Sequence, residues 1–123
     1  MPDAAALPPP DLSRLLTPRG WHDQPYVPFR DGIEICTLWQ GPPSVALLRY
    51  RPGAVAPRHR HDGLETILVL EGAQSDESGT YGAGSVVFNP PGTEHSVWSD
   101  EGCVVLIQWE RPVAFLAGET GAA

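Results

Sequence analysis

Two short blocks hold three of the four histidines of the chain, and they constrain its fold more than any other feature. The first block begins at Gly53, carries His59 and His61, and continues through Glu65 into an apolar run that ends at Gly72. Side chains alternate between the two faces of a β-strand, so two histidines separated by one residue share a face. Glu65 follows a short turn and can reach back towards them. The block therefore predicts three metal-binding side chains close together.

The second block runs from Gly84 to Ser99 and carries His95 shortly after Pro91-Gly92. Proline followed by glycine suits positions i+1 and i+2 of a type II turn. Two strands and two turns can therefore bring three neutral imidazole nitrogens and one carboxylate together. This donor set suits a divalent transition metal, and the candidate ligands are His59, His61, Glu65 and His95.

The spacings in both blocks resemble the two signature motifs of the cupin superfamily. The first motif has a glycine, His-x-His, a glutamate and a second glycine, and it is matched without departure at Gly53, His59, His61, Glu65 and Gly72. The second motif has a glycine, Pro-x-Gly and a histidine, and it is matched at Gly84, Pro90, Gly92 and His95. Ser99 stands where the second motif expects asparagine, at its least constrained position.

The sequence around both motifs is similar to that of the ChrR-like cupins. These include the cupin domain of zinc-containing anti-sigma factors and single-domain proteins like acetylacetone dioxygenase. This resemblance runs from about Trp21 to about Trp109. It implies an all-β, single-domain cupin, an RmlC-like jelly-roll β-barrel, with a short helical or irregular N-terminal extension. The expected boundaries are 1–20 for a partly flexible extension, 21–112 for the barrel and 113–123 for a C-terminal tail.

Composition agrees with one small all-β domain. The chain has 123 residues, enough for one core and too few for two. Its 13 glycines and 14 prolines lie between short apolar runs, as in a protein with many strands and turns. The net charge of −7, without a basic stripe, argues against nucleic acid and an anionic membrane as partners.

The compartment is expected to be the cytoplasm. No apolar run is long enough to span a bilayer, and the N-terminal residues lack the pattern of a signal peptide. Cys36 and Cys103 are the only cysteines, so no disulfide framework is implied. Both thiols are expected to pack as small apolar groups, with a redox pair as the alternative.

Several elements can be placed from local pattern. A short helix is expected over Asp11–Leu16, capped by Asp11 and ended by Thr17-Pro18. The alternating or apolar runs predict strands at 33–39, 44–50, 66–70, 85–88, 95–98 and 103–109. A polar hairpin is expected over Gln74–Tyr81, with Asp76 and Glu77 solvated near its tip.

Other conspicuous side chains are assigned to packing or solvent. Trp39, Trp98 and Trp109 are expected to pack in the barrel, with Trp98 and Tyr50 as alternative residues of the cavity wall. His22 is expected at the surface or at an interface. Arg58 and Arg60 alternate with the ligand histidines and should point outwards, whereas Arg49 and Arg51 are left open between solvent and cavity.

The cofactor is expected to be one divalent transition metal, zinc or iron(II), with manganese, nickel and copper also compatible with the donors. The leading function is a small metal-dependent dioxygenase that acts on a diketone-like or phenolic ketone, with the small molecule in the barrel and its catalytic residues unassigned. The alternative is a non-catalytic, zinc-bound sensor or ligand-binding cupin related to the anti-sigma-factor domain. A sugar isomerase or epimerase fits the four ligands less well. A homodimer is expected, because open barrel edges commonly pair.

Overall fold

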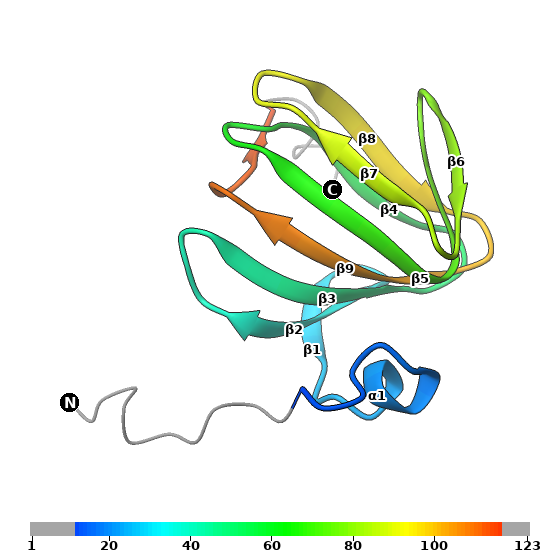
Figure 1. The fold of residues 1–123 in the computed structure, drawn as a ribbon. Helices are drawn as coiled ribbons and strands as arrows, with labels where there is room; N and C mark the ends of the chain where they lie inside the picture. Colours follow the sequence, from blue (N-terminus) through cyan, green and yellow to red (C-terminus); the bar gives the residue numbers. More distant parts are fainter. Residues whose placement is uncertain (1–11, 117–123) are drawn as a thin grey trace.

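Ten strands and one short helix make up residues 12–116, the part of the chain that the computed structural model describes (Figure 1). In chain order the elements are α1 (Pro18–His22), β1 (Val27–Arg30), β2 (Ile33–Trp39), β3 (Ser44–Tyr50), β4 (Ala54–Arg60), β5 (Glu65–Asp76), β6 (Gly79–Gly82), β7 (Val86–Asn89), β8 (Glu94–Ser99), β9 (Cys103–Trp109) and β10 (Ala114–Phe115). Within these residues, no helix has the length and apolarity needed to cross a membrane.

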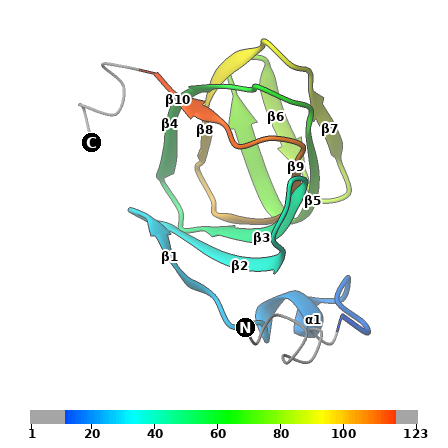
Figure 2. The same ribbon diagram turned by 90° about the vertical axis from the view of Figure 1, so that its left-hand side faces the viewer.

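The strands form one hydrogen-bonded path, β1-β2-β3-β9-β5-β8-β4-β10, while β6 and β7 pair with β5 beside it. All the paired strands are antiparallel. In the view of Figure 2 the path curls into a ring, and the segment between β9 and β10 runs across its open end. The predicted all-β barrel is therefore confirmed.

Gly72 marks the point at which β5 changes its partners. The first part of β5 pairs with β7 and β9, and residues from Ala73 onwards pair with β6. Gly72 has φ +72°, and a Cβ at this position would collide with the carbonyl oxygen of Gly102. Only glycine adopts this conformation without strain and leaves room for the crossing chain. The glycine that ends the first motif is thus a requirement of the barrel corner.

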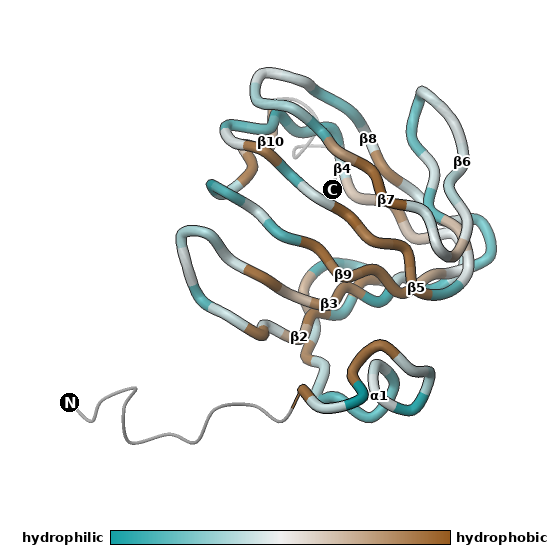
Figure 3. Tube along the Cα trace, viewed as in Figure 1, coloured by the Kyte–Doolittle hydropathy of each residue, from teal (hydrophilic) through white to brown (hydrophobic). Residues whose placement is uncertain are grey.

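Two apolar clusters lie on opposite faces of the same strands. The cluster inside the barrel includes Ile33, Leu48, Ile67, Val105 and Ile107. The outer cluster lies under the N-terminal segment and is formed by Leu15, Trp21, Cys36, Leu47 and Val104. Figure 3 shows the hydrophobic stretches of β3, β5 and β9 side by side, as strands buried on both faces require.

The helix begins where the sequence predicted that a helix would end. Residues 13–16 form a turn, α1 starts at Pro18, and the predicted cap Asp11 lies outside the described residues. The Thr17 hydroxyl accepts a hydrogen bond from the Gly20 amide at 3.2 Å and caps α1. Proline is favourable at the first helical position, since its missing N–H has no helical partner there. Thr17-Pro18 is therefore a start signal here.

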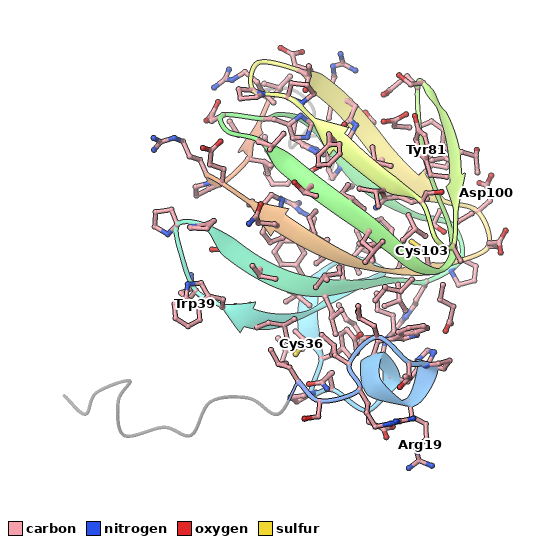
Figure 4. The ribbon with its side chains drawn as sticks, in the orientation of Figure 1. Arg19, Cys36, Trp39, Tyr81, Asp100 and Cys103 are labelled. Carbon is pink, nitrogen blue, oxygen red and sulfur yellow. The ribbon has the colours of Figure 1, made fainter. Side chains whose placement is uncertain are left out.

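Trp39 does not pack in the barrel as predicted. Its side chain is 67% exposed, and Figure 4 shows it pointing away from the barrel at the end of β2. The strand continues past the region that the core covers, so alternation along β2 alone did not indicate burial. The other expected strands are present. Their ends differ by at most one residue, except that the strand expected at 66–70 continues to Asp76 as β5.

The two cysteines behave as small apolar groups. Both are buried free thiols, one in the outer cluster and the other inside the barrel, and they lie well apart in Figure 4. Burial raises the pKa of Cys103 to about 11 and also raises the pKa of Cys36. The expectation of packed thiols is confirmed.

Candidate metal centre

The four predicted ligands come together inside the barrel. One side-chain donor atom from each of His59, His61, Glu65 and His95 lies within 4.8 Å of the others, and all four residues are buried. His59 and His95 are opposite each other in the pairing of β4 with β8, and their ring centroids are 4.7 Å apart. The ring of His61 lies 4.6 Å from that of His95. Glu65 is the first residue of β5, where this strand pairs with β7 and β9.

In each candidate ligand histidine, the Nδ1 atom is hydrogen-bonded to an oxygen atom outside the cluster. The acceptors are Pro57 O for His59 at 2.8 Å, Thr93 O for His61 at 3.0 Å and Asp76 Oδ2 for His95 at 2.9 Å. Carbonyl and carboxylate oxygens only accept, so each Nδ1 carries the proton and donates it. The Nε2 lone pairs are then left facing the centre, the tautomer that metal ligation needs.

Two buried nitrogens support a cation at this position. The Nε2 atoms of His61 and His95 are buried and have no hydrogen-bond partner within the described part of the chain. Nε2 of His61 lies 3.2 Å from Oε1 of Glu65, so a lone pair of the imidazole faces a carboxylate oxygen. A cation bound between or beside these two atoms would satisfy both of them, as buried polar groups almost always are. The donor set of three imidazoles and one carboxylate fits a divalent transition metal.

The charge states suit metal binding. Burial lowers the pKa of His59, which keeps its imidazole neutral. Burial alone would raise the pKa of Glu65, but the contact with His61 and the electrostatic interaction with the histidine cluster outweigh it and lower that pKa. These two shifts favour a neutral imidazole at His59 and an ionised carboxylate at Glu65, which are the ligand forms that bind metal.

Glu65 is held by two residues whose roles were not predicted from the sequence. Asn89 Nδ2 donates to Oε1 at 2.9 Å, and Trp109 Nε1 donates to Oε2 at 2.8 Å. Both residues are direct cross-strand partners of Glu65, one on each neighbouring strand. A carboxylate has about four acceptor sites, so these two bonds leave it free to ligate as well. Only the strand register reveals this arrangement.

Asp76 is not the solvated hairpin residue that was predicted. Its side chain is only 11% exposed and accepts the hydrogen bond of His95. The reason is the length of β5, which carries Asp76 past the barrel corner and alongside β8. Its neighbour Glu77 is half exposed, accepts from the Ser96 amide and lies 3.6 Å from Arg58.

The remaining candidates lie outside the cluster. Arg58 and Arg60 point outwards, as expected, and form surface ion pairs with acidic neighbours. Arg49 pairs with Glu34 at 2.9 Å and stacks over the Tyr26 ring, so it does not face the cavity, and Arg51 is exposed. His22 binds Glu71 at 2.8 Å near the barrel surface. Ser99, at the asparagine position of the motif, is buried and donates its hydroxyl hydrogen to Ala73 O at 2.5 Å.

A cavity of about 40 Å³ adjoins the ligands inside the barrel. Most of its wall is apolar, with His59 and Glu65 on the side of the candidate ligands. Tyr50 also lines it, which was one of the expected alternatives. Its other polar lining residues are Arg30, Gln74 and Trp109. Phe115 from β10 also lines the cavity, and its ring centroid is 5.5 Å from that of His59. Strand β10 lies in the segment expected to be a tail, and no strand was predicted there.

Comparison with known proteins agrees with this geometry. Residues 20–113 match the family described as the ChrR cupin-like domain. The chain is 36% identical over 87 residues to the anti-sigma-E factor ChrR of Cereibacter sphaeroides, an alignment that covers 68% of this chain and 41% of ChrR. The chain therefore spans about two fifths of that curated relative.

Solved structures include close matches to the fold. The crystal structure of Rhodobacter sphaeroides SigE in complex with the anti-sigma ChrR matches with a TM-score of 0.66 and 30% identity, over 72% of this chain and 49% of the other. An acetylacetone dioxygenase from Acinetobacter johnsonii matches with a TM-score of 0.71 and 21% identity, over 76% of this chain and 72% of the other. The second likeness concerns the fold alone. With the family match spanning most of the barrel and all four clustered ligands, this chain belongs to the ChrR cupin-like family.

Proposed function

We propose that the protein is a small metal-dependent dioxygenase that binds a diketone-like or phenolic ketone in the barrel. The observation that carries this proposal is the cavity beside the candidate ligands, whose wall includes both His59 and Glu65. A metal that only stabilises the fold needs no adjoining space, whereas a substrate must reach the metal. The fold likeness to an acetylacetone dioxygenase supports the same direction.

The ligand residues would hold the metal through Nε2 of His59, His61 and His95 and through the Glu65 carboxylate. A divalent metal bound there supplies a Lewis acid, and iron(II) also supplies the electrons for chemistry with oxygen. The outward hydrogen bonds of the three Nδ1 atoms keep the imidazoles in place. The apolar wall excludes bulk water, which strengthens polar contacts between the protein and a substrate.

Two polar residues can orient a substrate oxygen in this cavity. Tyr50 is buried, and burial raises its pKa well above the ordinary value, so it stays a neutral phenol that can donate a hydrogen bond. Gln74 is also buried and lines the same wall. A ketone presents acceptor oxygens, which match these donors better than a hydrocarbon without polar atoms would.

The test begins with elemental analysis of untagged protein that has been purified anaerobically, beside a His59→Ala/His61→Ala variant. We expect near-stoichiometric iron in the wild type and its loss in the variant. Oxygen uptake is then measured with acetylacetone and with a phenolic ketone. Uptake by the iron-loaded wild type but not by the variant supports the proposal. No metal in either protein, or no uptake with any diketone or phenolic ketone, contradicts it.

A zinc-bound sensor or ligand-binding module is the second candidate. Four protein donors form the closed set that is common for structural zinc, and the identity to the anti-sigma factor ChrR favours this role too. Stoichiometric zinc in the purified protein, together with no oxygen uptake after iron loading, would support this candidate over the dioxygenase.

A further inference from the structure

Arg30 brings a positive charge to the wall of the metal-adjacent cavity. It ends β1 and lines the cavity together with His59 and Glu65. Its guanidinium carbon lies 3.7 Å from the centroid of the Phe115 ring. Strands β1 and β10 are the two ends of the sheet path, so this contact joins the two edges of the curled sheet.

The hydrogen-bonding of Arg30 is incomplete. Its Nε atom is buried and has no hydrogen-bond partner among the residues that the structure describes. Arg30 takes part in none of the ion pairs found among residues 12–116. A buried donor without an acceptor is costly, and a guanidinium cannot lose its charge to relieve that cost. Packing on Phe115 explains the position of Arg30 but leaves its Nε–H unsatisfied.

Arg49 offers an internal comparison. Its guanidinium carbon lies 3.9 Å from the centroid of the Tyr26 ring, much like Arg30 over Phe115. Nε of Arg49 donates to Glu34 at 3.0 Å, so this arginine is both stacked and paired. Arg30 has the stacking without the carboxylate. Of these two stacked arginines, only the one that lines the cavity has an Nε–H group without an acceptor.

The charge around the cavity favours an anion. A divalent metal held by one carboxylate and three neutral imidazoles would have a net charge of +1, and Arg30 would add a second positive charge to the same wall. This positive region lies inside a chain whose formal net charge is −7. Opposite charges attract strongly where water is excluded. A small anion would supply the acceptor that Arg30 Nε lacks.

We propose that Arg30 binds the anionic oxygen of a small carboxylate or enolate in this cavity. The other end of this small molecule faces His59 and Glu65. The inference rests on the proposed function, because it places the small molecule beside the metal. It adds that this molecule is negatively charged. The cavity of about 40 Å³ selects a small molecule. Arg30 is thus a specificity-determining residue for negatively charged ligands.

The test uses full-length, zinc-loaded protein and isothermal titration calorimetry. The probes are acetate, its neutral counterpart acetamide, and acetylacetone as the source of an enolate. In Arg30→Met we expect acetate affinity to fall about 10- to 100-fold, the range for loss of a charge-assisted hydrogen bond. Acetamide affinity should change less than about twofold. Arg30→Lys should retain part of the acetate affinity, and the matched control Arg49→Met should retain all of it.

A second readout uses the wild type, so it does not depend on whether Arg30→Met folds. The Arg30 Nε–H signal in the NMR spectrum, assigned with Arg30→Lys, should shift on titration with acetate and stay in place with acetamide. A shift with acetylacetone alone would identify the enolate as the preferred form of the ligand. An unmoved Nε–H signal with both anions, or equal acetate affinity in wild type and folded Arg30→Met, would overturn the inference.

These outcomes are separate from those of the proposed function, because no oxygen uptake is measured. Zinc-loaded protein that binds acetate through Arg30, yet consumes no oxygen when iron-loaded, would keep this inference and reject the dioxygenase. If the protein takes up no metal, the NMR titration is performed on the metal-free protein, and an Nε–H signal that does not move there overturns the inference as well.

Discussion

At the scale of single residues, the ligand histidines depend on acceptors supplied by distant segments. His95 donates to Asp76, a residue 19 positions earlier in the chain, and His61 donates to Thr93, 32 positions later. Such outer hydrogen bonds set the tautomer and the orientation of a ligand ring. Their removal should weaken the metal site without removing a ligand.

Asp76→Ala tests this dependence directly. Without the carboxylate the His95 ring loses its orientation, and we expect metal affinity to fall about 10- to 100-fold, the usual effect of losing an outer partner. The measurement is competition with a chelator for zinc. Asp62→Ala is the control, because Asp62 is a half-exposed aspartate near the ligands that pairs with Arg60. Equal affinity of the two variants would contradict the role of Asp76.

Trp109→Phe tests the anchoring of Glu65. The change removes the Nε1–H donor and leaves one oxygen of a buried carboxylate without its partner. We expect the free energy of unfolding of the metal-free protein to fall by about 1–3 kcal/mol, measured by chemical denaturation. Trp39→Phe, at an exposed tryptophan, should stay within about 0.5 kcal/mol of the wild type. A loss of the same size in both variants would speak against the anchoring role of Trp109.

At the scale of elements, one glutamate ties α1 to the barrel. Trp21 Nε1 donates to Glu71 Oε1 at 2.9 Å, and His22 Nε2 lies 2.8 Å from the same oxygen. The hydrogen bond from Trp21 lowers the pKa of Glu71 below its ordinary value of 4.5. Burial opposes this shift, and the contact with His22 lowers the pKa further. The stability that the ionised Glu71 contributes is therefore complete above pH 4.5 and is lost as the pH falls through the lowered pKa.

This shift predicts how acid affects the unfolding of the protein. As the pH is lowered below 4.5, the free energy of unfolding should fall more steeply in the wild type than in Glu71→Gln, which cannot titrate. Chemical denaturation at a series of pH values measures both slopes. Glu101→Gln, at an exposed glutamate in the turn after β8, should keep the steep slope of the wild type. Parallel slopes for the wild type and Glu71→Gln would contradict the prediction.

At the scale of the whole molecule, a metal would join strands β4 and β8 to the first residue of β5. His59 and His95 belong to the pairing of β4 with β8, whereas Glu65 pairs with β7 and β9. A ligand that binds only the folded chain stabilises it by mass action, by about 4 kcal/mol at a thousandfold excess over Kd. We expect zinc to raise the melting temperature of the wild type by several degrees. Zinc should not change the melting temperature of His59→Ala/His61→Ala. A rise as large as in the wild type would indicate that zinc binds elsewhere.

The homodimer expected from the sequence stays a prediction, as does the cytoplasmic location. Strand β1 is one end of the sheet path, and its Val27 and Phe29 are 54% and 44% exposed. Light scattering of the purified protein should give twice the monomer mass of 13.3 kDa. If only the monomer mass is found at micromolar concentration, the dimer prediction is wrong.

The strands and the four candidate ligands could be predicted from the sequence, because both depend on short-range patterns. Alternation placed β2, apolar runs placed β3 and β9, and the spacing of His59, His61, Glu65 and His95 matched a known pair of motifs. Local pattern was insufficient at Thr17-Pro18, where the same two residues can end one helix or begin the next.

Only the tertiary structure decided what surrounds these ligands. Asp76 and Trp109 reach the site through strand register, and Arg30 meets Phe115 because the sheet curls until its two ends come together. No local periodicity encodes such partners, since a register is set by the packing of whole faces rather than by neighbouring residues. The sequence by itself thus determined the fold and the donor atoms, whereas the closure of the barrel determined their orientation and the charged wall of the cavity.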